Sequence, residues 1–239
     1  MAKKAAKARR NRPCRPLGLA VRSPAMHDIT GSFGDVLQRQ LELAAQNYEL
    51  LKGKGVRAIN VMGAIGSGKT ELIVCMAEKL RERRLRVGAI AGDVAGDDDY
   101  QRFRAAGLPA LQINTGDQCH LDAHQVGHAL EDFLLPEVDV LFIENIGNLV
   151  CPADFPLGTD MDLVVISVTE GEDMVRKHPK IFAQTDVVAV NKVDLAAFVG
   201  VDPERIAADY RKVNPHGKLV FTVAKNGKGV EELLSALGF

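Results

Sequence analysis

The sequence predicts an α/β protein: a mostly parallel central sheet with helices on both faces, and a further helix before the first strand. Two observations predict this class. Short, unbroken apolar runs alternate with longer segments of helical character, and a glycine-rich turn follows the first of these runs. Unbroken apolar strands are typical of parallel sheets that are buried on both faces. Ligands of such sheets bind at the carboxyl ends of the strands, so the residues after each strand are the functional candidates.

The expected strands are Val56–Met62, Leu85–Ala91, Ala110–Asn114, Val138–Asn145, Asp162–Val168, Asp186–Asn191 and Lys218–Val223. The expected helices between them are Glu71–Arg84, Tyr100–Ala106, His120–Phe133 and Pro203–Val213. A helix over Asp35–Lys52 is expected before the first strand, because apolar residues recur there at spacings of four and three. We expect it to pack on the main domain, and a partner-binding helix is the alternative.

Charge is distributed unevenly along the 239 residues. Residues 1–22 carry eight Lys and Arg residues and no acid, so the formal net charge of −1 leaves −9 on the rest (22 basic against 31 acidic residues). An acidic body argues against a nucleic-acid-binding surface. We expect residues 1–30 to form a disordered basic tail and linker, and residues 31–239 to form one globular domain. A phosphate or RNA contact, or part of a targeting sequence, are the alternatives for the tail.

Membrane insertion and export are not expected. The sequence has no run of about 18 apolar residues, the length that a membrane-spanning helix requires. Its basic tail lacks the apolar region of a secretory signal. The four cysteines are far apart in a chain large enough to fold without cross-links, so reduced thiols are expected rather than disulfides. These observations together predict a cytoplasmic protein.

The turn after the first expected strand is predicted to bind phosphate. GAIGSGKT, residues 63–70, fits the pattern of glycine, four residues and Gly-Lys-Ser/Thr, and it lies between an expected strand and an expected helix. In such loops backbone N–H groups point at the phosphates, the lysine neutralises the β- and γ-phosphates, and the hydroxyl binds Mg²⁺. The residues expected to bind nucleotide here are Gly63, Ala64, Gly66, Ser67, Gly68, Lys69, Thr70 and Glu71.

The stretch NKVD follows the sixth expected strand and resembles the guanine-reading motif of GTPases. The carboxylate of Asp194 can accept both N–H donors on the guanine edge, whereas adenine would leave it unpaired. Asn191, Lys192 and Asp194 are therefore expected to bind the base of GTP or GDP. Ala224 and Lys225, in the loop after the last strand, resemble a second base-contacting loop, and an ordinary glycine turn is the alternative.

Acidic residues follow two other strands. Asp93 begins a run that continues to Asp99, and this run is expected to form a switch loop or a solvated turn. Glu144 ends a very apolar strand and is followed by Gly147, where most GTPases have an Asp-x-x-G motif that touches Mg²⁺ and the γ-phosphate. The residues expected to carry catalysis are Lys69, Thr70, Asp93 and Glu144, with Mg²⁺ held by Thr70 and Asp93. Slow turnover is expected, because no arginine finger or water-positioning residue is evident.

Soft metal ligands gather after the third expected strand, in the stretch GDQCHLDAH. It contains Cys119, His120 and His124, and Cys151 lies four residues beyond Gly147. If the two thiolates meet near the imidazoles, they form a sulfur and nitrogen ligand set suited to Zn²⁺ or Ni²⁺. The alternatives are a buried free cysteine at position 151 and a histidine on a helix surface at position 124.

These motifs together resemble one family: the nickel-insertion GTPases required to mature nickel–iron hydrogenase, often called hydrogenase accessory protein B. The matching blocks are GAIGSGKT, GDVAGDDD, INTGDQCHLDAH, LFIENIGNLVCPADFPLG, SVTEGEDMVRKHP and NKVDL. The resemblance implies a homodimeric GTPase whose interface holds metal through Cys119, His120 and Cys151, with His124 a further ligand. It also implies two partners, a nickel metallochaperone and the precursor of the hydrogenase large subunit.

The tail departs from this family, some members of which carry an N-terminal nickel motif with several cysteines or a histidine-rich stretch. The tail of this chain has only Cys14 and His27, so no nickel store is expected there. The related urease-maturation GTPases are the nearest alternative, and the ENIGNLVCP block favours the hydrogenase branch. Two other kinds of protein remain as alternatives: a metal-storage protein with a vestigial nucleotide site, and a P-loop kinase that acts on a small substrate.

Overall fold

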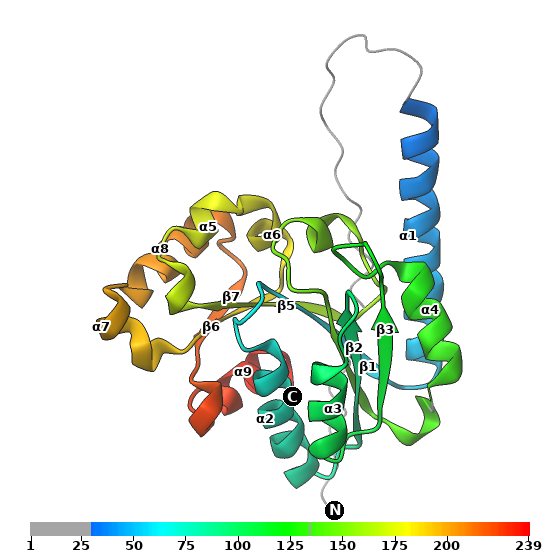
Figure 1. Cartoon of the computed structure of the whole chain (residues 1–239), viewed down its shortest axis with the longest axis horizontal. Helices are drawn as coiled ribbons and strands as arrows, with labels where there is room; N and C mark the ends of the chain where they lie inside the picture. The colour runs from blue at the N-terminus through cyan, green and yellow to red at the C-terminus, as the bar shows by residue number, and fades with distance from the viewer. Residues whose placement is uncertain (1–29, 134) are drawn as a thin grey trace, which may run out of the picture.

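The central sheet is parallel throughout its seven strands, in the order β3-β2-β4-β1-β5-β6-β7 (Figure 1). The strands are β1 (Arg57–Met62), β2 (Val87–Asp93), β3 (Ala110–Asn114), β4 (Val140–Glu144), β5 (Met161–Ser167), β6 (Val187–Asn191) and β7 (Lys218–Phe221). This computed structural model describes residues 30–133 and 135–239. Of the predicted tail, residues 1–30, all but Thr30 lie outside the described residues. The predicted fold class and all seven strands are confirmed, with ends that differ by at most two residues.

Nine α-helices are assigned in the described part of the chain, and five short 3-10 turns separate them. The α-helices are α1 (Thr30–Gly53), α2 (Lys69–Glu82), α3 (Asp98–Ala105), α4 (Ala123–Asp132), α5 (Met174–Lys177), α6 (Pro179–Gln184), α7 (Ala196–Val199), α8 (Pro203–Val213) and α9 (Val230–Ala236). The 3-10 turns are η1 (Leu135–Glu137), η2 (Cys151–Asp154), η3 (Val168–Glu170), η4 (Val193–Leu195) and η5 (Ala224–Asn226).

The start of α4 differs from the prediction in a way that matters for the site. A helix was expected from His120, but α4 begins at Ala123 because Asp122 caps it. The Asp122 carboxylate accepts a hydrogen bond from the backbone N–H of Gln125 (2.8 Å), and the Gln125 side chain accepts one from the N–H of Asp122 (3.2 Å). This reciprocal capping box sets the start of the helix at Ala123. Cys119 and His120 therefore lie in a loop before the helix.

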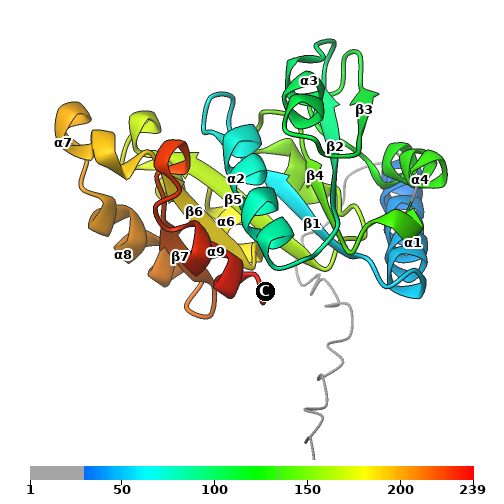
Figure 2. The same ribbon diagram turned by 90° about the horizontal axis from the view of Figure 1, so that it is seen from below.

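Helices cover both faces of the sheet, as the unbroken apolar strands predict. On one face α2, α3 and α9 bury Leu72, Phe103 and Leu233 against the strands. On the other face α1 and α4 cover one half of the sheet, and α5, α6 and α8 cover the other half. In Figure 2, α2 and α9 lie in front of the sheet, and α1 lies beside α4 at its edge.

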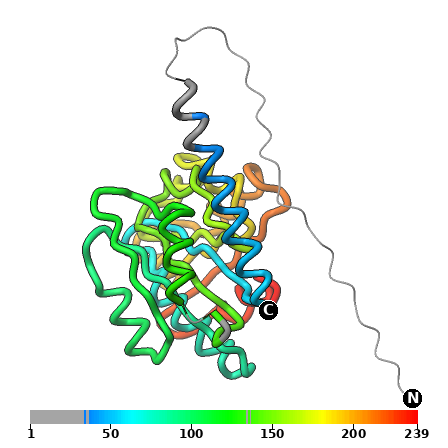
Figure 3. Tube along the Cα trace, turned by 90° about the vertical axis from the view of Figure 1, so that its right-hand side faces the viewer, coloured from blue at the N-terminus to red at the C-terminus, as the bar shows by residue number. Residues whose placement is uncertain are grey.

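Helix α1 packs against α4 and forms part of the domain (Figure 3). It begins at Thr30, five residues before the predicted start. Its buried Asn47 donates hydrogen bonds to the carbonyl oxygens of Ala123 (2.7 Å) and Leu157 (3.0 Å). These bonds join α1 to the start of α4 and to the loop before β5. None of the helices within residues 30–133 and 135–239 is long and apolar enough to cross a membrane.

Candidate nucleotide and metal site

The phosphate loop, residues 63–70, joins β1 to α2 as predicted, and its glycines adopt conformations that other residues rarely reach. Gly63 has φ +149° and Gly68 has φ +97°. A Cβ atom at Gly63 would lie 2.1 Å from the carbonyl oxygen of Val165, and one at Gly68 would lie 2.4 Å from Nδ2 of Asn191. Both positions therefore require glycine for space as well as for backbone conformation.

Lys69 and Thr70 begin α2 and are both 6% exposed. The Thr70 hydroxyl lies 3.0 Å from Glu144 Oε1 and 2.6 Å from Asp99 Oδ1, with Thr70 as donor. Lys69 Nζ lies 3.8 Å from Glu144 Oε1. The structure thus brings together three of the four predicted catalytic residues. It adds Asp99, which the sequence placed only in an acidic run.

Glu144 is a buried carboxylate with one oxygen that no hydrogen-bond donor contacts among the described residues. Burial raises the pKa of Glu144 to about 7, although Lys69 acts to lower it. Its Oε2 atom is buried and has no hydrogen-bond partner among the described residues. An unpaired buried carboxylate oxygen beside a hydroxyl and a second carboxylate fits a hard cation such as Mg²⁺, which prefers oxygen ligands.

Asp93, the fourth predicted catalytic residue, lies at the end of β2 and is partly buried. Its Oδ1 accepts a hydrogen bond from the backbone N–H of Val94 (2.6 Å). No hydrogen bond joins it to Thr70 within the described residues, and its shared binding of Mg²⁺ with Thr70 stays a prediction. Asp99 accepts the hydrogen bond from Thr70 instead, because α3 starts at Asp98 and its first turn lies over the phosphate loop.

The predicted base-binding residues meet at the carboxyl ends of β6 and β7. Asn191 is 1% exposed, and its side chain connects the phosphate loop to the loop after β7. Its Nδ2 donates to the carbonyl oxygen of Ser67 (2.9 Å), and its Oδ1 accepts from the backbone N–H of Ala224 (3.0 Å). Lys192 has a positive φ of 59° and donates from Nζ to the carbonyl oxygen of Gly66 (2.7 Å). Both residues hold the base-binding edge against the phosphate loop.

Asp194 and Lys225 are exposed beside this edge. No hydrogen bond or ion pair occupies the Asp194 carboxylate within the described part of the chain. Its acceptor oxygens are therefore available to a ligand, as guanine recognition requires. Ala224 is buried and contributes through its backbone, in the 3-10 turn η5.

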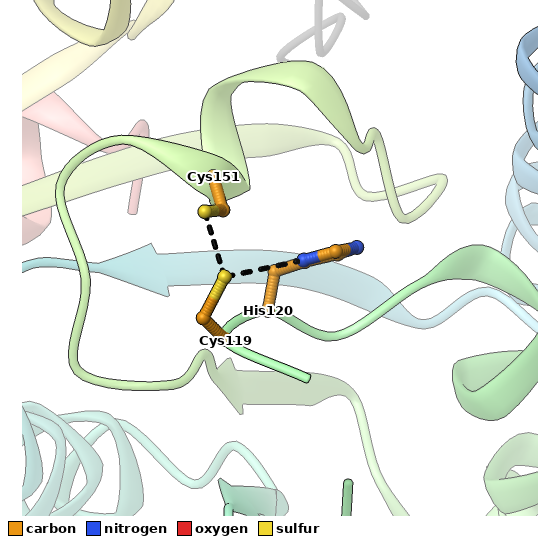
Figure 4. A group of neighbouring side chains, drawn as sticks. All are labelled: Cys119, His120 and Cys151. Carbon is orange, nitrogen blue, oxygen red and sulfur yellow. Dashed lines mark hydrogen bonds between the residues drawn. The ribbon is translucent and has the colours of Figure 1, made fainter. Parts of the chain in front are cut away.

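Two cysteines and a histidine form a cluster on the loops that follow β3 and β4 (Figure 4). Cys119 and His120 belong to the metal loop, residues 115–122, and Cys151 begins η2. Cys119 Sγ lies 2.7 Å from Cys151 Sγ and 3.9 Å from His120 Nδ1. The three ligand atoms lie within 4.8 Å of one another, and both cysteines are free thiols. Close thiols beside an imidazole suit a soft or borderline cation such as Ni²⁺ or Zn²⁺.

The surroundings of the cluster shift the pKa values of His120 and Cys119 in opposite directions. Burial lowers the pKa of His120, whose ring stacks on Phe155 with ring centroids 3.7 Å apart. The hydrogen bond to Cys151 raises the pKa of the Cys119 thiol. A neutral imidazole is the form that coordinates metal, whereas the thiols must release protons when an ion binds.

His124 does not join this cluster, which corrects the sequence-based prediction. It lies in the first turn of α4, is exposed, and packs its ring against His128 with centroids 4.5 Å apart. The reason is local: the helix starts at Ala123, so His124 follows the helix surface while His120 remains in the loop. Spacing in sequence alone did not reveal this boundary.

The metal cluster adjoins the phosphate loop through the β4 loop, residues 145–150. Gly147 lies so close to Ile65 that a Cβ atom there would be 2.3 Å from its Cγ1 atom. Asn148 forms an isolated antiparallel bridge with Gly63, and its side chain contacts the metal loop. Neither Asn145 nor Asn148 was predicted to belong to the site. Their position in sequence, between Glu144 and Cys151, was the feature that could have indicated them.

A phosphate loop between β1 and α2 of a seven-stranded parallel sheet defines a P-loop nucleotide-binding protein. The cluster on the neighbouring loops adds a candidate metal site. Residues 57–221 match the model of the nucleotide-binding domain described as CobW/HypB/UreG. The chain belongs to this family and, within it, to the HypB hydrogenase maturation factors.

Individual relatives agree with this assignment. The chain is 46% identical over 200 residues to a probable hydrogenase maturation factor HypB of Methanocaldococcus jannaschii, covering 84% of this chain and 90% of that protein. The crystal structure of HypB from Archaeoglobus fulgidus matches with a TM-score of 0.77 and 46% identity, covering 84% of this chain and 97% of that one. HypB from Helicobacter pylori, solved in complex with nickel, matches with a TM-score of 0.78 and 32% identity, covering 83% and 93%.

Proposed function

We propose that this protein is a GTPase that binds Ni²⁺ or Zn²⁺ and assists nickel insertion during hydrogenase maturation. The observation that carries this proposal is the path of one short segment. Between Glu144 and Cys151 the chain passes from a carboxylate beside the phosphate loop to a thiol of the metal cluster. Its relatives are named as hydrogenase maturation factors, and one was solved with nickel.

On the nucleotide side, Lys69 supplies positive charge to the β- and γ-phosphates, and the backbone N–H groups of residues 63–70 surround them. Thr70, Glu144 and Asp99 form the oxygen-rich group that would hold Mg²⁺, which supplies further positive charge to the phosphate oxygens. Asp194 selects guanine by accepting its two N–H donors, while Lys225 lies on the opposite loop.

On the other side, the metal ion is cargo. Cys119, His120 and Cys151 supply three ligands, and Zn²⁺ in proteins usually takes four. A second copy of the chain, or a partner that receives the metal, would complete the shell. This supports a homodimer, with a nickel metallochaperone and the hydrogenase large-subunit precursor as the donor and acceptor of the ion.

Nucleotide and metal binding are coupled in this proposal. The metal loop is tied to the end of β2, since the N–H of Thr115 donates to the carbonyl oxygen of Asp93 (2.9 Å). Cys151 directly follows the β4 loop, which contacts the phosphate loop. Movement of either loop changes the spacing of the thiols, and metal affinity depends on that spacing. By linkage, bound metal must change nucleotide affinity by the same factor.

The first test measures phosphate release from GTP and ATP by the purified chain with Mg²⁺. We expect slow release from GTP and much less from ATP. Lys69→Ala should lower GTP turnover about 100- to 1000-fold, the cost of removing one preorganised charge-stabilising group. Lys79→Ala is a matched control, because this lysine lies on the same helix and pairs with Glu82 on its exposed surface.

Full activity in Lys69→Ala would contradict the nucleotide site. A preference for ATP would favour a P-loop kinase, and no turnover with tight metal binding would favour a storage protein. Metal content and oligomeric state, measured with and without a non-hydrolysable GTP analogue, test the metal and the dimer. A chain that stays monomeric and metal-free with the analogue and added Ni²⁺ would contradict that part.

A further inference from the structure

Two asparagines of the β4 loop hold the metal loop from either side of His120. Asn145 Oδ1 accepts a hydrogen bond from the backbone N–H of Leu121 (3.0 Å). Asn148 Nδ2 donates one to the backbone carbonyl oxygen of Cys119 (3.2 Å). The residues directly before and after His120 are therefore each bound by one asparagine side chain.

Asn145 is fixed in the protein core. It is 1% exposed, and its Nδ2 donates to Asn60 Oδ1 (3.2 Å). Asn60 in turn donates to Asp162 Oδ1 (2.9 Å) on the neighbouring strand β5. This row of side chains runs from the residue after β4 across β1 to β5, and both asparagines in it are buried. Buried, hydrogen-bonded side chains resist movement, so the Leu121 end of the contact is the stationary one.

Asn148 has a different environment. It lies at the surface of the β4 loop, partly exposed, and its backbone pairs with Gly63 at the start of the phosphate loop. Its Oδ1 accepts from the N–H of Val150 (2.8 Å), which sets the turn that leads to Cys151. One side chain thus contacts the backbone of Cys119 and the turn before Cys151, and the same residue touches the phosphate loop.

We infer that Asn148 is a positioning residue: it sets the spacing of Cys119 and Cys151 and makes that spacing respond to the nucleotide at the phosphate loop. This inference rests on the proposed coupling of GTP and metal. Nucleotide binding moves the loop at Gly63 and Gly147, Asn148 moves with it, and the two thiols shift relative to each other. Asn145 holds the Leu121 side of the metal loop in place meanwhile.

The test compares the metal affinity of the GDP-bound and GTP-analogue-bound chain, by Ni²⁺ titration followed through thiolate-to-nickel absorption. In Asn148→Ser the hydroxyl can still accept from Val150 N–H, but it is too short to reach Cys119. Asn114→Ser is the matched control, since Asn114 ends β3 five residues before Cys119 and its side chain accepts a hydrogen bond from Gln112 on the same strand.

We expect the two nucleotide states of the wild type to differ in nickel affinity by a factor of about 5 to 150, the usual range of such couplings. In Asn148→Ser this ratio should fall to about 1, whereas Asn114→Ser should retain it. A merely structural role would weaken nickel binding equally in both states. An unchanged ratio in Asn148→Ser, even with weaker binding overall, would overturn the inference.

A second measurement separates this inference from the coupling on which it rests. With the metal-free chain, the rate at which diamide oxidises Cys119 and Cys151 to a disulfide reports how often the thiols meet. We expect Asn148→Ser to slow this reaction several-fold and Asn114→Ser to leave it unchanged. Equal rates in wild type and Asn148→Ser would overturn the positioning role. Equal nickel affinities in both nucleotide states of the wild type would instead overturn the proposed coupling.

Discussion

Lys69 and Glu144 form a buried pair, with Nζ and Oε1 3.8 Å apart and side chains that are 7% and 2% exposed. The lysine comes from the phosphate loop and the carboxylate from the neighbouring strand β4. The pair is incomplete, because the second oxygen of Glu144 has no partner within the described residues. Desolvation therefore outweighs the attraction, and the pKa of Glu144 rises to about 7.

Stability should depend on pH through Glu144. Since its pKa rises from 4.5 to about 7 on folding, the folded chain binds the proton more tightly than the unfolded chain. The resulting stability is fully present below pH 4.5 and is lost as the pH rises through about 7. Relative to Glu144→Gln, the free energy of unfolding of the wild type should fall by about 3 kcal/mol across this interval. Urea denaturation of the metal- and nucleotide-free chain measures it, and parallel pH profiles of the two proteins would contradict the assignment.

Guanine selection should depend on Asp194. In Asp194→Asn an N–H₂ donor replaces one acceptor oxygen against the guanine edge, which should cost about 2–4 kcal/mol of GTP affinity. Affinity should move towards xanthosine triphosphate, which offers the complementary acceptor. Competition binding of the two nucleotides measures this, with Asp132→Asn, at the exposed end of α4, as the control. Undiminished GTP affinity in Asp194→Asn would show that another residue reads the base.

The two histidines of the metal region should differ sharply. His120→Ala removes a ligand from the cluster. Loss of a residue that only hydrogen-bonds to a ligand weakens metal binding by up to about 100-fold, so loss of the ligand itself should weaken Ni²⁺ binding by more than this. His124→Ala should change nickel affinity by less than about twofold, because His124 packs on His128 away from the thiols. Competition against a chromophoric chelator measures both. A large loss in His124→Ala would mean that His124 of one chain reaches metal held elsewhere in an assembly.

Helix α1 should contribute to the stability of the domain. Asn47→Ala removes the two hydrogen bonds that the Asn47 amide donates to the carbonyl oxygens of Ala123 and Leu157. The expected loss is about 2 kcal/mol in the free energy of unfolding. Chemical denaturation of Asn47→Ala and of Gln46→Ala, an exposed neighbour, makes the comparison. Equal stability of the two variants would revive the interpretation of α1 as a loosely held helix for a partner.

Local rules explain why so much of the fold could be predicted. Unbroken apolar runs such as Val187–Val190 are typical of strands buried on both faces, and the segments between them have helical length. GAIGSGKT and NKVD are contiguous, so their geometry is largely set by their own backbone. The sequence by itself therefore determined the fold class and the place of the phosphate loop, and it predicted a base-reading edge at Asn191–Asp194.

Contacts between distant segments were decided only by the tertiary structure. The sequence singled out Asp93 and left Asp99 in an acidic run, but the start of α3 brings Asp99 within hydrogen-bond distance of the Thr70 hydroxyl. His124 was predicted as a further ligand beside His120, with a helix-surface position as the alternative, and the Asp122 capping box sets the start of α4 so that His124 lies on the helix surface. Asn148 carries no motif of its own, and its contacts with Gly63 and Cys119 exist because the loops after β1, β3 and β4 meet. A ligand cluster needs atoms that lie a few ångströms apart. The order of the strands determines which loops come that close, and this order depends on how the whole sheet packs.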